Sequence, residues 1–362
     1  MKGAILGLWV LVLLAAPVAV QGQYAYSTNA DGSIYTYTTN ADGSANIIIY
    51  TGPPWAVSIP TNIEGLKVTS IQNDIPGHSA MNEEVTSITI PDSLTSIGSF
   101  ALFGGSLSNV TIGKGVTNIG DEAFFYCLNL ATITVDAQNA FYSSVNGVLF
   151  DKSQTSLIQF PTGLGGSYTI PDSVTNIGVD AFDLCFNLTN ITLANGVTSI
   201  GVDAFASCGG LTNMTIPPSV TCIEEFSFYG CESLTSVYFM GNAPSVGANV
   251  FLADSSVTTY YLPSTTGWSL VFWGYPSSGP PAVLWNPLIQ TGHGSLGVSN
   301  KQFGFNITNG ATTKIPIAVE ACTNLACPVW TSLTNVMLTN TFHFSDPQWT
   351  NYPVRYYGLG FP

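Results

Sequence analysis

Apolar residues recur with a fixed period through the middle of the chain. Three consecutive segments carry Ile, Val, Phe and Cys at matching positions: YTIPDSVTNIGVDAFDLCFNLTN, ITLANGVTSIGVDAFASCGGLTN and MTIPPSVTCIEEFSFYGCESLTS. They begin at Tyr168, Ile191 and Met214, and a further unit begins at Val237, so the starts are evenly spaced. Self-similarity at a fixed period of this length predicts a solenoid, in which each unit buries its apolar side chains against the next.

Each unit is predicted to contain two short strands. One unit opens with the apolar residues Leu211, Met214 and Ile216, and the last two show the two-residue alternation of a strand. Pro217 then turns the chain, because proline lacks the N–H donor that continues a ladder. VTCI is the second apolar run, and FSFYGC closes the coil. We therefore expect a charge at Ile191 or Ile216 to unfold several coils.

The repeat begins imperfectly near Val57, settles at Val85 and is interrupted once. The interruption, YSSVNGVLFDKSQTSLIQFP, is predicted to form a hairpin that turns at residues 151–154 and is fastened to the sheet. Before the repeat, TNADGSIYTYT begins at Thr28 and TNADGSANIII at Thr39, and Asp-Gly favours tight turns between strands. These segments predict hairpins that cap the solenoid. Calcium sites at Asp31 and Asp42 are disfavoured, because one carboxylate per loop is too few ligands.

After the repeat, VYFMGNAPSVGANVF and TTYYLPSTTGWSLVFWGYP are rich in aromatic residues and predict a C-terminal cap. SSGPP follows as a predicted linker, and alternating short runs beyond it predict a small antiparallel β-domain. The predicted divisions are a signal peptide (1–22), a β-hairpin cap with a degenerate first repeat (23–84), the solenoid with its C-terminal cap (85–275), the linker (276–281) and the small β-domain (282–362).

The segment 1–22 resembles an export signal. Lys2 supplies the positive charge, an apolar stretch follows at 4–16, and Val20 and Gly22 are small residues before a cleavage site at Gln23. The alternative is an uncleaved membrane anchor, since residues 3–20 are free of charge. We predict cleavage, which leaves a secreted or cell-surface protein without a membrane-spanning segment.

Charge restricts the possible partners. The chain has 21 acidic and 7 basic residues, for a net charge of −14. Nucleic acid and anionic lipid are excluded as partners, because both require clustered Lys and Arg.

Four of the seven cysteines occupy one repeat position, three residues after a phenylalanine: Cys127, Cys185, Cys208 and Cys231. Side chains in register stack about 5 Å apart and point the same way, which fits disulfide geometry poorly, so these are predicted to be buried thiols. Cys322 and Cys327 are the disulfide candidates, and Cys222 has no predicted role.

The motifs ITIPDSLTSIG, YTIPDSVTNIGVDAFDLC and GVLFDKSQTSLIQFP resemble the BspA-like leucine-rich repeats of secreted and cell-surface bacterial proteins, over about residues 57–265. The resemblance implies a mostly β solenoid, a right-handed horseshoe with short parallel strands on its concave side. It also implies a binding or adhesive role without catalytic residues. The segments EACTNLACPVW and DPQWTNYPVR resemble short C-terminal modules of secreted environmental bacterial proteins, whose role is not established.

The outward positions of the concave strands form a polar row. The middle residues of these strands are Thr89, Thr111, Thr134, Thr169, Thr192, Thr215, Tyr238 and Tyr261. Asn109, Asn190 and Asn213 lie beside the row. One interpretation is that threonine simply suits strands. The other is a binding face that ends in an aromatic patch. The predicted ligand-binding residues are Thr111, Thr134, Thr169, Thr192, Thr215, Tyr238, Tyr261, Asn190 and Asn213.

No catalytic constellation, metal site or cofactor is predicted. The chain contains no GxSxG, HExxH or Walker motif. His78 with Glu83 and Glu84 is interpreted as a solvated loop rather than a metal site. The predicted function is a non-catalytic extracellular binding or adhesion protein for a protein or carbohydrate. The alternatives are an envelope-associated protein, with the repeat as spacer and the C-terminal domain for attachment, and a hydrolase.

Overall fold

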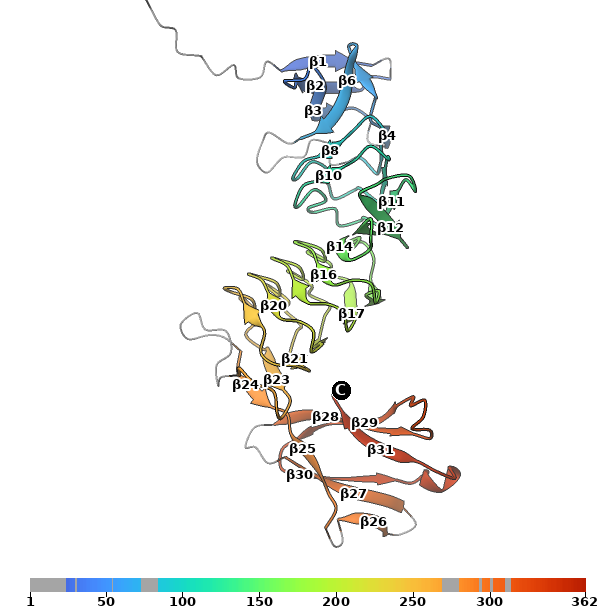
Figure 1. Cartoon of the computed structure of the whole chain (residues 1–362), viewed down its shortest axis with the longest axis vertical. Coiled ribbons are helices and arrows are strands. Elements are labelled where there is room, and N and C mark those ends of the chain that lie inside the picture. The colour runs from blue at the N-terminus through green and yellow to red at the C-terminus, as the bar shows by residue number, and fades with distance from the viewer. Residues whose placement is uncertain are drawn as a thin grey trace, which may run out of the picture.

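The computed structural model describes residues 24–29, 31–53, 55–72, 84–268, 280–292, 295–299, 302–309 and 314–362. The predicted signal peptide, most of the predicted linker, His78, Glu83 and His293 lie outside the described residues. The described chain winds into a β-solenoid of about nine turns, followed by a small antiparallel β-domain (Figure 1). The predicted fold class is confirmed.

One side of the solenoid is formed by the longer strand of each coil, which we call the long ladder. Its strands pair in parallel within three groups, β11-β9-β7-β4, β15-β17 and β19-β21-β23-β24. The strands are β4 (Ala56–Ser58), β7 (Ser87–Ile90), β9 (Asn109–Ile112), β11 (Thr132–Val135), β15 (Gly166–Thr169), β17 (Leu188–Thr192), β19 (Asn213–Ile216), β21 (Ser236–Phe239), β23 (Thr258–Tyr261) and β24 (Ala282–Leu284).

The second run of each coil forms the short ladder, which is also parallel. Its strands are β6 (Leu66–Ile71), β8 (Ser96–Ile97), β10 (Asn118–Ile119), β14 (Ser156–Gln159), β16 (Asn176–Ile177), β18 (Ser199–Ile200), β20 (Cys222–Ile223) and β22 (Ser245–Val246). The first three belong to one sheet and the last five to another.

The predicted N-terminal hairpins are confirmed. Strands β1 (Ala25–Thr28), β2 (Ile34–Thr39) and β3 (Ala45–Thr51) pair antiparallel, β3 pairs in parallel with β6, and β5 (Asn62–Ile63) pairs with β6. The two Asp-Gly loops are built alike. Asp31 Oδ1 accepts bonds from the amide and hydroxyl of Ser33 at 2.9 and 2.6 Å, and Asp42 does the same for Ser44. Both carboxylates therefore stabilise turns.

The predicted inserted hairpin is also confirmed. Strand β13 (Val148–Asp151) pairs antiparallel with β14, which then continues the short ladder by pairing with β16. In the turn, Asp151 accepts bonds from the Thr155 hydroxyl at 2.9 Å and the Ser156 amide at 2.7 Å. An additional strand, β12 (Tyr142–Val145), pairs with β13 and was not predicted.

Stacked phenylalanines and cysteines form the core of the solenoid. The rings of Phe182, Phe205, Phe228 and Phe251 stack with successive centroids 4.9, 5.3 and 5.3 Å apart. Beside them the four repeat cysteines are buried free thiols, as predicted. Each thiol bond reaches the preceding coil, since Cys208 Sγ donates to the carbonyl oxygen of Phe182, and Cys231 Sγ to that of Phe205, both at 3.1 Å. Burial raises the pKa of Cys127 to about 12, so this thiol stays protonated.

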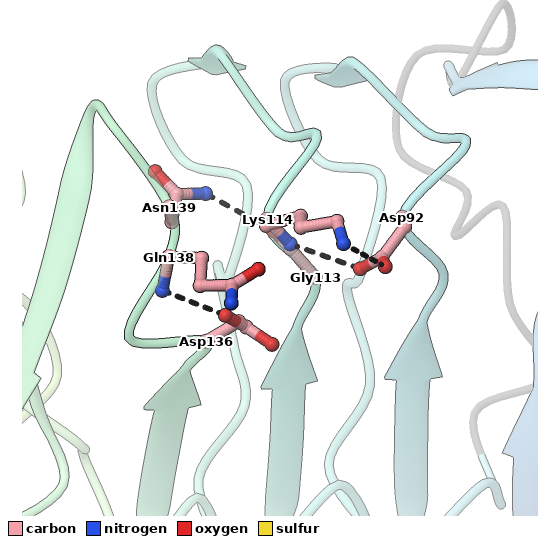
Figure 2. A network of polar contacts seen from close by, with 6 residues as sticks. All are labelled: Asp92, Gly113, Lys114, Asp136, Gln138 and Asn139. Atoms are coloured by element: carbon pink, nitrogen blue, oxygen red, sulfur yellow. Dashed lines mark hydrogen bonds and ion pairs between the residues drawn. The ribbon is translucent and has the colours of Figure 1, made fainter.

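Polar contacts join successive coils at the turns that follow the long strands (Figure 2). Asn139 is fully buried, and its amide nitrogen donates to the carbonyl oxygens of Gly113 and Val116, both at 3.0 Å. One turn earlier, Lys114 Nζ lies 3.2 Å from Asp92 Oδ2 in an exposed ion pair. The Asn139 bonds contribute more stability, because exposed ion pairs add little whereas a buried amide must be paired.

The C-terminal domain consists of two small antiparallel sheets. One contains β25 (Pro287–Gln290), β26 (Leu296–Ser299), β27 (Gln302–Asn309) and β30 (Thr341–Asp346). The other contains β28 (Ile315–Cys322), β29 (Thr331–Leu338) and β31 (Tyr356–Gly360), and a 3-10 turn, η1 (Trp349–Asn351), follows β30. In this domain Asp346 forms a buried ion pair with Arg355 (2.9 Å) and accepts a hydrogen bond from Tyr357 (2.8 Å).

Two predictions about the C-terminal region are wrong. Cys322 and Cys327 form no disulfide, because Cys322 is buried at the end of β28 while the following loop carries Cys327 into solvent. The division at residue 282 is also misplaced. Strand β24 belongs to the long ladder, with Val283 opposite Tyr260, so the small domain begins after it.

The long ladder supplies a matched pair of substitutions that tests the inward and outward positions. Ile216 is 1% exposed, whereas its neighbour Thr215 is exposed. We expect Ile216→Asp to lower the free energy of unfolding by more than about 4 kcal/mol, because it buries an unpaired charge. Thr215→Asp should change it by no more than about 0.5 kcal/mol. Urea unfolding followed by circular dichroism measures both, and equal effects would refute the assignment of faces.

Candidate binding surface on the long ladder

The predicted threonine row exists and lies in register. Thr111 is opposite Thr134, Thr169 is opposite Thr192, and these four side chains and Thr215 are exposed. Asn190 and Asn213 lie two residues earlier on their strands and are exposed as well. The repeat therefore places the polar part of the predicted site on one side of the solenoid.

Threonines of the solenoid fall into two classes according to what their hydroxyl groups bind. Those before the short strands donate to the preceding coil, as Thr198 Oγ1 does to the Thr175 carbonyl oxygen at 3.0 Å. Thr117 and Thr221 make equivalent bonds. Within the described chain, the five predicted threonines of the row make no side-chain hydrogen bond. Their hydroxyl groups are thus free to bind a ligand, whereas the first class is structural.

A hollow interrupts the face between β17 and β19. These strands are consecutive in the long ladder, yet among the described strands no ladder joins them, since β17 pairs with β15 and β19 with β21. The open hollow has a volume of about 480 Å³. Four predicted residues line it, Asn190, Thr192, Asn213 and Thr215. The structure therefore concentrates part of the predicted face at one place.

The hollow is also lined by residues that the sequence did not indicate. Pro217, Pro218 and Met240 are among them, and Met240 is 36% exposed. Together with the amides and hydroxyls they form a neutral surface, because no charged side chain of the described chain lines the hollow. Such a lining can donate and accept several hydrogen bonds while it contacts an apolar ligand surface.

The prediction that Tyr238 belongs to an exposed aromatic patch is wrong. Its side chain is 2% exposed. The ring stacks on Phe361, from the C-terminal end of the small domain, with centroids 4.2 Å apart, and on Tyr260 at 5.3 Å. Trp285 extends the same cluster, and its indole nitrogen donates to the Pro316 carbonyl oxygen at 2.7 Å. The aromatic end of the row therefore receives the small domain.

The prediction that Tyr261 continues the outward row is also wrong, because the last unit is one residue short. Tyr238 is opposite Tyr260, and Tyr261 is opposite Phe239. A shift of one residue turns a side chain to the other face of a strand. Tyr261 consequently stacks on Trp268 at 5.0 Å, with ring planes 8° apart, and does not continue the threonine row.

Carboxyl groups gather at a second place, on the turns that close the coils. Asp180, Asp183 and Glu122 line one cavity of about 10 Å³. Burial and then neighbouring acidic groups raise the pKa of Asp180 to about 8 and that of Asp183 to about 7. Paired carboxyl groups of perturbed pKa are a feature of glycosidases. This cavity, however, is about the size of one water molecule, so it does not admit a sugar ring.

The remaining candidate chemistry is dispersed. His343 Nδ1 lies 2.7 Å from Asn306 Oδ1, whereas Ser345 donates to Gln302 at 2.6 Å, so His343 and Ser345 have different partners. In the described ranges, no three His, Cys, Asp or Glu side chains are grouped in a way that could hold a metal ion. Among the same residues, no helix is long and apolar enough to cross a membrane.

Comparison with known proteins identifies the repeat. The sequence model of the BspA type leucine-rich repeat region matches in six copies, over residues 73–168 and 162–268. No curated protein sequence matches significantly.

Several solved structures are similar at low identity. The pneumococcal vaccine antigen PcpA is 19% identical over 66% of this chain and 81% of its own, with a TM-score of 0.46. A leucine-rich cell surface protein of Faecalibacterium prausnitzii is 20% identical over 75% and 96%, with a TM-score of 0.40. A leucine-rich repeat protein of Eubacterium ventriosum is 20% identical over 73% and 85%, with a TM-score of 0.42.

Because Tyr238 is buried, its substitution should lower the stability of the protein. We expect Tyr238→Ala to destabilise the protein by about 3–5 kcal/mol, because it opens a cavity between the last coils and the small domain. Tyr26→Ala is the control, since Tyr26 is 70% exposed and should shift stability by at most about 0.5 kcal/mol. Thermal and urea unfolding compare the two. A Tyr238→Ala protein as stable as the unsubstituted chain would contradict the observed packing.

Proposed function

The chain belongs to the BspA-type leucine-rich repeat family, and from this membership we propose that it is an exported, non-catalytic binding protein that recognises an extracellular carbohydrate or protein on its long ladder. Export rests on the predicted signal peptide at residues 1–22, and placement at the cell surface or in the medium follows from it. Binding is assigned to the hollow between β17 and β19. The outward threonine row continues on either side of this site.

The observation that carries this proposal is the coincidence of the hollow with unbonded hydroxyl groups. Thr192 and Thr215 are exposed, make no side-chain hydrogen bond in the described chain, and line one of the two places where consecutive strands of the long ladder are not paired. The opening between β17 and β19 adds concave volume at one position.

A neutral glycan fits this lining best. Asn190, Asn213 and the two threonines offer amide and hydroxyl groups that can bond to sugar hydroxyls, while Pro217 and Met240 offer apolar surface for the C–H face of a sugar ring. An acidic ligand is disfavoured, because no basic side chain among the described residues lines the hollow and the chain has a net charge of −14.

Removing only the hydroxyl groups tests the site. We expect Thr192→Val with Thr215→Val to weaken binding of a glycan, first identified on an array, by roughly 5- to 150-fold, because two hydrogen bonds of about 0.5–1.5 kcal/mol each are lost. Calorimetry measures the affinity. The matched control is Thr111→Val with Thr134→Val, two exposed threonines of the same row away from the hollow.

The control distinguishes the hollow from the whole face. A loss confined to the first pair supports the hollow, and equal losses in both pairs would move the site to the entire row. Unchanged affinity in both double variants, with unchanged melting temperatures, would refute binding on the long ladder.

A second function is favoured by an exposed apolar loop in the small domain. Leu325 is 53% exposed and Val329 79%, in the loop between β28 and β29. These side chains suit attachment to another envelope component, with the solenoid as a spacer.

Attachment is tested separately from ligand binding. We expect Leu325→Ser with Val329→Ser to reduce retention of the protein on cells at least about tenfold, since burying each side chain contributes about 1.5–3 kcal/mol. Leu288→Ser with Leu296→Ser is the control, because both side chains are about half exposed elsewhere in the same domain. Equal retention of the two variants, measured by immunoblot of cell and medium fractions, would rule out attachment through this loop.

A further inference from the structure

The last coil of the solenoid has a carboxyl group where the other coils have a thiol. Cys185, Cys208 and Cys231 are evenly spaced along the chain, and one further interval of the same length reaches Asp254. Asp254 also lies three residues after Phe251, whose ring continues the phenylalanine stack. It therefore occupies the cysteine position in both sequence and packing.

At three of the four repeat cysteines, Cys127, Cys208 and Cys231, the thiol donates a hydrogen bond to the preceding coil. Cys208 donates to the Phe182 carbonyl oxygen and Cys231 to that of Phe205, in each case one coil earlier. The equivalent acceptor for Asp254 is the Phe228 carbonyl oxygen. An ionised carboxylate only accepts hydrogen bonds, so only the protonated acid can take the place of the thiol.

The surroundings of Asp254 favour the neutral acid. The residue is 7% exposed, and neither carboxyl oxygen has a hydrogen-bond partner within the described chain. Glu232, from the preceding coil, adds negative charge that raises the pKa of Asp254, and the Cys231 thiol is neutral. The Cys231 backbone amide lowers this pKa, and its effect is the smallest of the three causes. Among the described residues, no basic group acts on it. Burial, followed by Glu232, raises the pKa of Asp254 to about 7.

Asp254 lies just before the part of the solenoid that receives the small domain. Its amide donates to the Phe251 carbonyl oxygen at 3.1 Å, and Val257 donates to the Asp254 carbonyl oxygen at 3.3 Å, which shapes the turn that leads into β23. Strand β23 pairs with β24 and carries Tyr260, which packs in the same cluster as Tyr238 and Trp285. The turn at Asp254 is thus connected through β23 to the junction between the solenoid and the small domain.

We propose that Asp254 carries a proton in the folded protein and donates it in a hydrogen bond to the Phe228 carbonyl oxygen. Rising pH removes this proton and therefore loosens the last coil and its packing against the small domain. The protein is then most firmly assembled in acidic surroundings. Its ordinary repeat counterpart, a cysteine, would confer no such dependence below pH 8, because the buried thiols keep their protons.

The direction of the pH dependence follows from linkage. The folded-state pKa, about 7, lies above the ordinary value of 3.8, so folding takes up a proton between these two values. Stability from this group is complete below pH 4, falls as pH rises, and is lost above about pH 7. The loss in the folding equilibrium constant is at most about tenfold per pH unit, or up to about a thousandfold in all.

The chain supplies its own control, since Asp254→Cys restores the repeat residue. Urea unfolding of the full chain under reducing conditions is compared for the unsubstituted protein, Asp254→Cys and Asp254→Asn between pH 4 and 8. Asn also donates without titrating. For each variant, the gain is the ratio of its folding equilibrium constant to that of the unsubstituted protein. We expect this gain to be at least about tenfold larger at pH 7 than at pH 4, and to level off above pH 7. Asp180 and Asp183 are common to all three proteins and cancel in the comparison.

Hydrogen exchange locates the effect. We expect amides of residues 236–262 to exchange faster at pH 7.5 in the unsubstituted protein than in Asp254→Cys, after correction for the intrinsic rate, with residues 188–216 unchanged. A gain that is constant across pH in both variants would overturn the proposal. A gain that varies with pH but leaves residues 236–262 equally protected would overturn the link to the small domain. Should Asp254→Cys fail to fold, Asp254→Asn decides both points.

Discussion

The structure depends on one constraint, which is that a single coil is too thin to bury its own apolar side chains. Phe205 is fully buried only because Phe182 and Phe228 stack on its two faces. The thiols of Cys127, Cys208 and Cys231 follow the same rule, since each donates to a carbonyl group of the preceding coil. Stability therefore belongs to the stack rather than to any unit, and both ends of the stack must be covered.

The two ends are covered in different ways. At the N-terminus, β3 pairs with β6, so the hairpins extend the short ladder. At the C-terminus, β24 extends the long ladder, and the small domain packs Phe361 onto Tyr238. The repeat loses its regularity at this junction, where a unit is one residue short and Asp254 replaces a cysteine.

Burial of the apolar positions also determines what is available outside. With Ile, Val, Phe and Cys in the core, the outward face of the long ladder is left with hydroxyl and amide groups and little charge. This face would be uniform if every strand were paired. The absence of a ladder between β17 and β19 creates the one hollow on it in the described region that combines the predicted Thr192 and Thr215 with Pro217 and Met240.

The sequence alone determined the solenoid, its period, the buried thiols and the hairpins, because these depend on local patterns repeated in register. The threonine row was visible for the same reason. Only the tertiary structure decided that Tyr238 is covered by Phe361 and that Tyr261 stacks on Trp268, because these partners lie far along the chain and outside the repeat. The spacing from Cys231 to Asp254 was also present in the sequence. Its consequence depends on burial and on the lack of a partner within the described chain, which are properties of the folded stack.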